Sequence, residues 1–207
     1  MGRFELPPAY GEDGFDEESS FFQSLRADIE DWTRGRWWAV RLPLLLYLAW
    51  GLRAHLKDPY YGTLLFSGVT LAIHEIGHVI FGFAPMFFAI AGGTFLQLAA
   101  PVATSAIFIR QRDYFGVTVA GFWLSYSLFN VATYAEDAKF RDLPLVSLGS
   151  GEIIHDWNYM LTSLGMLESH LAVASFVRFL AGTIGFASLA AGVWLCWRMF
   201  RARPSAQ

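Results

Sequence analysis

Apolar stretches about 20 residues long recur along this chain of 207 residues, and they restrict its fold more than any other feature. Inside a bilayer no water is available to the backbone, so a spanning segment satisfies its own N–H and C=O groups by forming a helix. Only 16% of the residues are charged, against about 25% in an ordinary soluble domain. The sequence therefore predicts an all-α, polytopic membrane bundle of about five transmembrane helices.

The predicted spans are separated by short connections, except for one long polar segment. We place the spans at 37–56, 61–84, 86–109, 114–134 and 171–197. Residues 21–38 have apolar side chains at helical spacing, which predicts an amphipathic helix on the membrane surface; packing of this helix on the bundle is the alternative. The polar connection at 135–169 separates the last two spans. Its later part, 152–167, is predicted to be a short helix that dips into the bundle.

Three regions follow from this pattern: an acidic tail and surface helix at 1–36, a transmembrane domain at 37–200 and a basic tail at 201–207. Half of the 18 Asp and Glu residues lie in the first 31 positions, so the N-terminal region could dock a protein partner. No basic stripe remains once the arginines that flank the spans are set aside, which argues against nucleic-acid binding. The single cysteine, Cys196, excludes a disulfide within the chain.

The stretch TLAIHEIGHVIFGF at 70–83 places three ionisable side chains inside the second predicted span. His74 and His78 are four residues apart and therefore share one face of a helix. Glu75 lies about 100° around that helix. This H-E-x-x-H pattern offers two imidazole ligands for zinc and a glutamate general base. The alternative is a set of buried polar side chains bonded to neighbouring helices, but each such group costs about 2.5–3.5 kcal/mol on insertion scales, which favours a metal site.

A zinc site of this kind needs a third protein ligand, and the polar connection offers three candidates. Asp137 lies at the end of the fourth predicted span, and His155 and Asp156 follow in IIHDWNY. His155 is favoured by its donor type and Asp137 by its position. Asp156 either ligates the metal itself or orients a ligating imidazole. Each of the three could instead be a solvated loop charge.

Counting spans as odd and even predicts how the ends of the helices are distributed between the two membrane surfaces. The connection at 135–169 falls on the surface where the motif helix ends. The two ends of the chain fall on opposite surfaces. Arg34 and Arg36 are therefore expected on one surface, and Arg110 and Arg112 on the other. The positive-inside rule then favours an external location for the surface where the motif helix ends.

These motifs resemble the site-2 protease family of intramembrane zinc metalloproteases. That family carries H-E-x-x-H in one span, G-P-x-x-N in the next, and a later N…P…DG stretch whose aspartate is the third zinc ligand. GTFLQ at 93–97 resembles the second motif, and NVATYAED at 130–137 resembles the third. The resemblance implies that Asp137 is the third ligand and that Asn130 and Gln97 contact the substrate or the backbone. In this family the active site usually opens toward the cytosol.

The chain also departs from the family pattern. Thr94 replaces the proline of the second motif, Ala138 replaces the glycine of the third, and no proline follows Asn130. The HDW at 155–157 is not part of the family pattern. In its combination of H-E-x-x-H, a DA pair and HDW, the whole chain is more similar to a group of uncharacterised bacterial membrane proteins.

Together these features predict a zinc metallopeptidase of the bacterial inner membrane. Its substrate would be a membrane protein or peptide, cut in or next to the bilayer with Glu75 as the general base. Hydrolysis of a lipid amide or ester by the same ion is one alternative. A non-catalytic metal-binding subunit of a larger membrane complex is another. Five histidines are too few for the histidine clusters of a di-iron desaturase.

Overall fold

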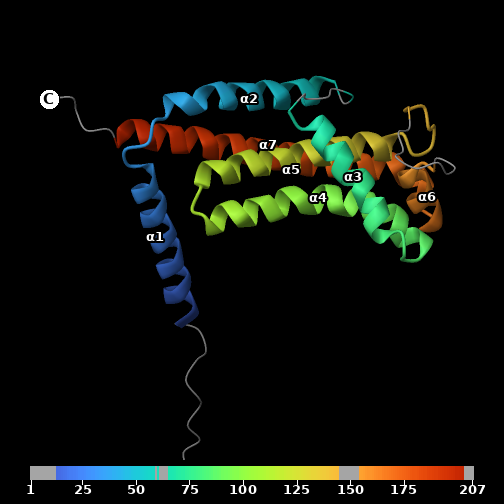
Figure 1. Ribbon diagram of the computed structural model, residues 1–207, viewed down its shortest axis with the longest axis horizontal. Coiled ribbons are helices and arrows are strands. Elements are labelled where there is room, and N and C mark those ends of the chain that lie inside the picture. Colours follow the sequence, from blue (N-terminus) through green and yellow to red (C-terminus); the bar gives the residue numbers. More distant parts are fainter. Residues whose placement is uncertain (1–12, 59, 61–64, 145–153, 203–207) are drawn as a thin grey trace, which may run out of the picture.

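The computed structural model describes residues 13–58, 60, 65–144 and 154–202, and these residues form helices and no strand, as predicted (Figure 1). The elements are α1 (Asp13–Thr33), η1 (Ala39–Arg41), α2 (Leu42–Lys57), α3 (Ser67–Phe81), α4 (Met86–Arg110), α5 (Tyr114–Glu136), α6 (Asp156–Ser163), η2 (Leu167–Ser169) and α7 (His170–Arg201). Most of the predicted acidic and basic tails, and the first residues of the second span and of the 152–167 helix, lie outside the described residues.

Three segments are long and apolar enough to cross a membrane: α4, α5 and the continuous stretch Leu167–Arg201 that includes α7. The other two predicted spans correspond to α2, with 16 residues, and α3, with 15 residues. At 1.5 Å per residue, α3 covers about 22 Å, which is less than the hydrocarbon core of about 30 Å. The predicted count of about five spans is therefore not confirmed.

Four helices, α2, α4, α5 and α7, run side by side, while α3 slants across one end of the bundle (Figure 1). The C-terminus of α7 therefore lies at the same end as α1. There Glu30 pairs with Arg198 at 2.7 Å and Asp28 pairs with Arg112 at 3.3 Å. These contacts differ from the predicted placement of the two chain ends on opposite surfaces. The physical reason is that α3 does not carry the chain back along the bundle.

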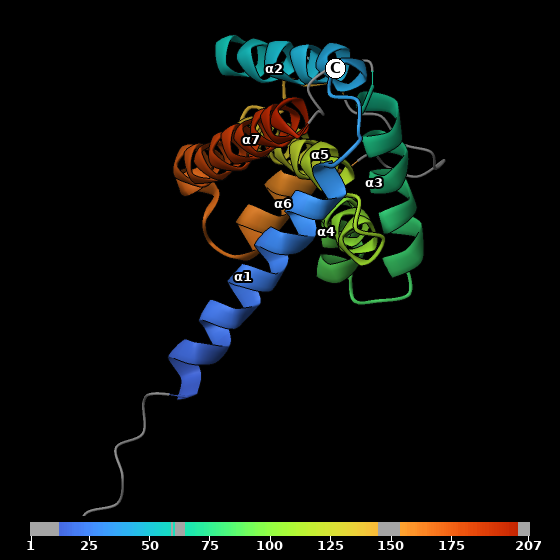
Figure 2. The same cartoon turned by 90° about the vertical axis from the view of Figure 1, so that its left-hand side faces the viewer.

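The central helix is α5, around which the other helices of the bundle are arranged (Figure 2). Its contact with α7 depends on small residues. Ser125 donates a hydrogen bond to the Ala181 carbonyl at 2.7 Å, and Gly185 lies directly against the Ser125 hydroxyl. Small side chains allow two helix backbones to approach closely, which is how helices associate in membranes. This contact fixes α5, and with it the residues that reach the site.

Local signals fix where two of the helices begin. The Asp113 carboxylate accepts a hydrogen bond from the Gly116 N–H at 3.1 Å and so caps α5. The His155 side chain caps α6 by accepting from the Asn158 N–H at 3.2 Å. The prediction of a short helix within 152–167 is confirmed by α6, which packs against α4.

The amphipathic helix predicted at 21–38 corresponds to the later part of α1, which ends at Thr33, and its C-terminal turns contact the bundle (Figures 1 and 2). Trp32 meets Tyr114 edge-to-face, with ring centroids 5.7 Å apart. A hydrogen bond from Arg26, together with the nearby Arg198 guanidinium, holds the pKa of Glu30 below its usual value. The same carboxylate pairs with Arg198 and so links α1 to the end of α7.

Two glycines of α7 provide a matched test of the α5–α7 contact. A Cβ at Gly185 would lie 2.6 Å from the Ser125 hydroxyl and 2.9 Å from Leu52, whereas a Cβ at Gly182 would meet nothing within 4 Å. We expect Gly185→Ala to destabilise the protein by about 1–3 kcal/mol through overpacking, and Gly182→Ala to be neutral or mildly stabilising. Thermal unfolding of the two variants in detergent measures this difference, and equal midpoints would contradict it.

Candidate metal centre

Three ligand atoms converge where α3 meets α6. His74 Nε2 lies 2.9 Å from Asp156 Oδ2, His78 Nε2 lies 3.2 Å from the same oxygen, and the two Nε2 atoms are 3.1 Å apart. Around a tetrahedral zinc ion the ligand atoms are about 3.3 Å from one another, given metal–ligand distances of about 2.0–2.1 Å. His74 and Asp156 are buried and His78 is partly buried. This group could hold a metal ion.

A chain of hydrogen bonds fixes the orientation of the His74 ring. The Gln97 amide nitrogen donates to the Ser127 carbonyl at 3.2 Å. A carbonyl oxygen only accepts, so this bond sets which end of the Gln97 amide is the oxygen. That oxygen, Oε1, lies 2.9 Å from His74 Nδ1, and the Nδ1 atom therefore carries a proton. In the neutral ring, Nε2 then presents its lone pair to Asp156.

The His78 ring is fixed in the same way by the backbone of α4. Its Nδ1 lies 3.0 Å from the Ala89 carbonyl oxygen, which also can only accept. His78 therefore donates through Nδ1 and presents the lone pair of Nε2. Ligating histidines typically donate their second ring nitrogen to a carbonyl or carboxylate in this manner.

The result is a cluster of three acceptor atoms with no donor between them when both rings are neutral. Two nitrogen lone pairs and a carboxylate oxygen repel one another at such distances, and burial strengthens the repulsion. A cation at the centre, either a metal ion or added protons, removes this repulsion. The donor set of two imidazoles and one carboxylate fits zinc, and three protein ligands leave a fourth position open.

Glycines at the crossing of α3 and α4 make room for the two imidazoles. A Cβ at Gly77 would overlap the backbone of Gly92 and Gly93, so α3 and α4 touch at this point. A Cβ at Gly93 would lie 2.5 Å from His78 Nε2 and 2.8 Å from His74 Nε2. Gly93 is the residue that matches the glycine of the second family motif, and here it leaves space for the ligand atoms themselves.

Glu75 is also buried, on the inward face of α3. The same helix exposes Ile76 and Val79, so the pattern of burial distinguishes the motif face from the outer face. Among the residues that the structure describes, the group that could hold a metal ion consists of His74, His78 and Asp156 and does not include Glu75.

Asp137 and His155 lie outside this group and pair with each other. The Asn158 N–H donates to His155 Nδ1 at 3.2 Å, so the His155 proton is on Nε2. That nitrogen lies 3.1 Å from Asp137 Oδ2 and donates to it. Both nitrogens of His155 are therefore engaged by protein atoms. The Asp137 carboxylate also accepts from the backbone N–H groups of Asp142 at 2.9 Å and Leu143 at 3.1 Å.

The Asp137–His155 pair acts as a clamp between the end of α5 and the start of α6. The Asn158 side chain adds a hydrogen bond to the Ala138 carbonyl at 2.8 Å. The Tyr134 hydroxyl accepts the Asp156 N–H at 3.4 Å. These contacts hold the first residue of α6, Asp156, against the two imidazoles.

The resemblance pointed to Asn130 and Gln97, and the structure brings these two side chains together. The Gln97 amide nitrogen donates to Asn130 Oδ1 at 3.2 Å, so Gln97 links the His74 ring to α5. Sequence reasoning missed the Ala89 carbonyl, the Ser127 carbonyl and the Tyr134 hydroxyl. The two carbonyls are backbone groups and carry no signal in the sequence.

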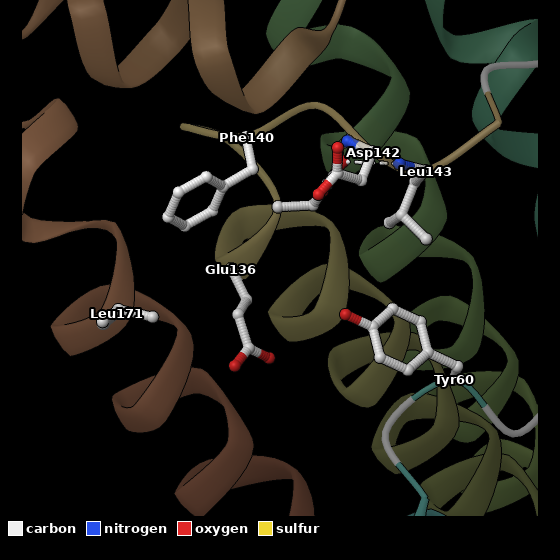
Figure 3. Close-up of a pocket in the computed structure, with 7 residues that line it drawn as sticks. Tyr60, Glu136, Phe140, Asp142, Leu143 and Leu171 are labelled. Atoms are coloured by element: carbon white, nitrogen blue, oxygen red, sulfur yellow. Dashed lines mark hydrogen bonds between the residues drawn. The ribbon is translucent and has the colours of Figure 1, made fainter.

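A cavity of about 370 Å³ lies beside the clamp (Figure 3). It is lined by Tyr60, Glu136, Asp137, Phe140, Asp142, Leu143 and Leu171. Figure 3 shows side chains from the end of α5 and the start of α7 around it. Asp137 lines the cavity and also contacts His155, the residue before Asp156, so the cavity lies near the His74–His78–Asp156 group, although none of these three residues lines it.

No protein-family model, curated protein or solved structure matches this chain.

The crowding at Gly93 gives a first test of the group. Gly93→Ala places a methyl group against both Nε2 atoms, and we expect it to abolish most metal binding. Gly68→Ala is the control, because Gly68 lies in the same helix as the motif and a Cβ there meets nothing within 4 Å. Metal content of the purified variants measures the effect. Full occupancy in Gly93→Ala would contradict the geometry.

The clamp gives a second test, which separates positioning from ligation. In Asp137→Asn the amide presents an N–H where the carboxylate accepts a hydrogen bond, so the clamp weakens. Loss of such supporting contacts costs about 10–100-fold in metal affinity. His155→Gln keeps a donor and an acceptor but is a poor zinc ligand, so we expect it to retain more metal than His155→Ala. If His155→Gln and His155→Ala lost the same amount of bound metal, His155 would itself be a ligand.

Proposed function

We propose that this protein is an integral-membrane zinc metallopeptidase, resembling site-2 proteases, that hydrolyses a peptide bond in or next to the bacterial inner membrane. One observation carries the proposal. Two imidazoles with protons fixed on Nδ1 direct their Nε2 lone pairs at a buried carboxylate oxygen. An arrangement of acceptors alone is well suited to a cation, and H-E-x-x-H supplies a base beside it.

In the proposed site, His74, His78 and Asp156 hold the ion. A zinc ion at such a site acts as a Lewis acid and lowers the pKa of water toward about 7. Asp156 thereby takes the role that the resemblance gives to Asp137. Asp137 and His155 position Asp156 and do not themselves bind the ion.

Glu75 is the proposed general base, because it follows His74 directly and, like His74, is buried. Its carboxylate accepts a proton from the attacking water while the water oxygen bonds to the scissile carbonyl carbon. It then gives that proton to the amine nitrogen as the C–N bond breaks. A glutamine at this position keeps the shape of the side chain and cannot accept the proton.

The test combines metal content with activity in the detergent-purified protein. We expect elemental mass spectrometry to find close to one zinc per chain in the parent and in Glu75→Gln, and little in His78→Ala. His170→Ala is the matched control, since His170 is a buried histidine that bonds the Leu167 carbonyl elsewhere in the fold. Cleavage of single-span peptides in liposomes, followed by mass spectrometry, should be lost in both Glu75→Gln and His78→Ala.

Two results would overturn parts of this proposal. A parent protein that holds no zinc and takes none up on incubation excludes the metal site, and the three acceptors then share protons. Cleavage that is unchanged in Glu75→Gln but lost in His78→Ala excludes Glu75 as the base and leaves the metal with a structural role.

A further inference from the structure

One end of the bundle gathers arginines from four segments of the chain, namely the α1–α2 connection, the end of α4, the α4–α5 turn and the end of α7. We call it the arginine end, and it comprises Arg34, Arg36, Arg41, Arg110, Arg112, Arg198 and Arg201. The α1–α2 connection, the end of α4, the start of α5 and the end of α7 all meet there (Figure 1). The pairs Glu30–Arg198 and Asp28–Arg112 confirm that these segments are neighbours.

Aromatic rings accompany these arginines. The Arg36 guanidinium lies 4.5 Å from the centre of the Trp32 ring, and that of Arg201 lies 4.9 Å from the centre of the Trp197 ring. Trp37 is 65% exposed at the same end. Exposed tryptophans with adjacent arginines are typical of the boundary between lipid and water, where the rings lie at headgroup level. The arginine end therefore has the composition of a membrane-surface layer.

The opposite end, where α5 ends and α6 and α7 begin, has fewer basic groups. Its described basic residues are Arg53, Lys57, Lys139, Arg141 and Arg178. Lys139 pairs with Glu168, and Arg178 pairs with Glu136. The positive-inside rule depends on the number of lysines and arginines near the membrane, with little contribution from acidic residues. By that rule the arginine end is the cytoplasmic one.

The candidate metal group lies in the half of the bundle away from the arginine end. Gln97, which orients His74, bonds the Ser127 carbonyl and the Asn130 side chain. At 1.5 Å per residue, Ser127 is about 20 Å along α5 from the arginine end and about 14 Å from the other end. The cavity in Figure 3 is lined by Glu136 at the end of α5 and Leu171 at the start of α7, so it lies at that other end.

We propose that the arginine end contacts the anionic phospholipid surface of the cytoplasmic leaflet, so that the His74–His78–Asp156 group and its adjacent cavity face the outside of the cell. This orientation is opposite to the one that the site-2 protease resemblance implies. It rests on the distribution of charge and on the path of α5, and it holds whatever ion the group binds. Under this proposal, water and any polar substrate segment reach the group from the external surface.

Cysteine labelling in intact cells tests the orientation. Cys196 is the only cysteine in the chain and is buried, so Cys196→Ala gives a clean background. Gln111→Cys then marks the arginine end and Glu168→Cys marks the opposite end, both at exposed positions. We expect a membrane-impermeant maleimide to label only Glu168→Cys in intact cells and both variants after permeabilisation. Labelling of Gln111→Cys alone, of both or of neither in intact cells would overturn the proposed orientation.

A charge-neutralised variant tests whether the arginines themselves set this orientation. In the Gln111→Cys background, Arg36, Arg110, Arg112 and Arg201 are changed together to glutamine. We expect the labelled fraction in intact cells to rise severalfold, because the attraction to the anionic leaflet is reduced. Arg53→Gln with Lys57→Gln is the control and should leave the labelled fraction unchanged. No rise in the first variant would overturn the role of the arginine end.

Discussion

The site depends on two hydrogen bonds, one at the Nδ1 atom of each histidine of the motif, that fix the orientation of the rings. His74 donates to the Gln97 side chain and His78 donates to the Ala89 carbonyl. Both acceptors belong to α4, so one helix sets the orientation of both imidazoles. Because each Nδ1 atom is occupied, the two Nε2 lone pairs face Asp156. Without these bonds the rings could rotate, and the convergence of three acceptor atoms would be lost.

The close contact of α3 with α4 is what allows α4 to play this role. Gly77 and Gly93 remove the side chains that would separate the two helices. At this contact α3 slants across the end of the bundle (Figure 1). A 15-residue helix in this position brings the motif against α4 and the start of α6, while its outer face exposes apolar side chains.

Two aspartates of the polar connection show how different partners give similar residues different roles. Asp137 is satisfied by one imidazole N–H and two backbone N–H groups, which compensate its negative charge. Asp156 Oδ2 faces two imidazole nitrogens that present lone pairs, so these two contacts do not compensate its negative charge when both rings are neutral. A buried carboxylate in that situation needs a cation. The difference suits Asp137 to positioning and Asp156 to metal binding.

The sequence by itself determined that the chain is helical, that the two histidines of the motif share a helix face, and that a short helix follows the fourth apolar stretch. These features depend on local periodicity, which is visible in a single sequence. The tertiary structure alone decided which of Asp137, His155 and Asp156 meets the imidazoles. His155 and Asp156 are adjacent in the chain, but His155 caps α6 and Asp156 begins it, so their side chains point to different neighbours. Such a difference depends on how α5 and α6 are clamped together, and no spacing in the sequence records it.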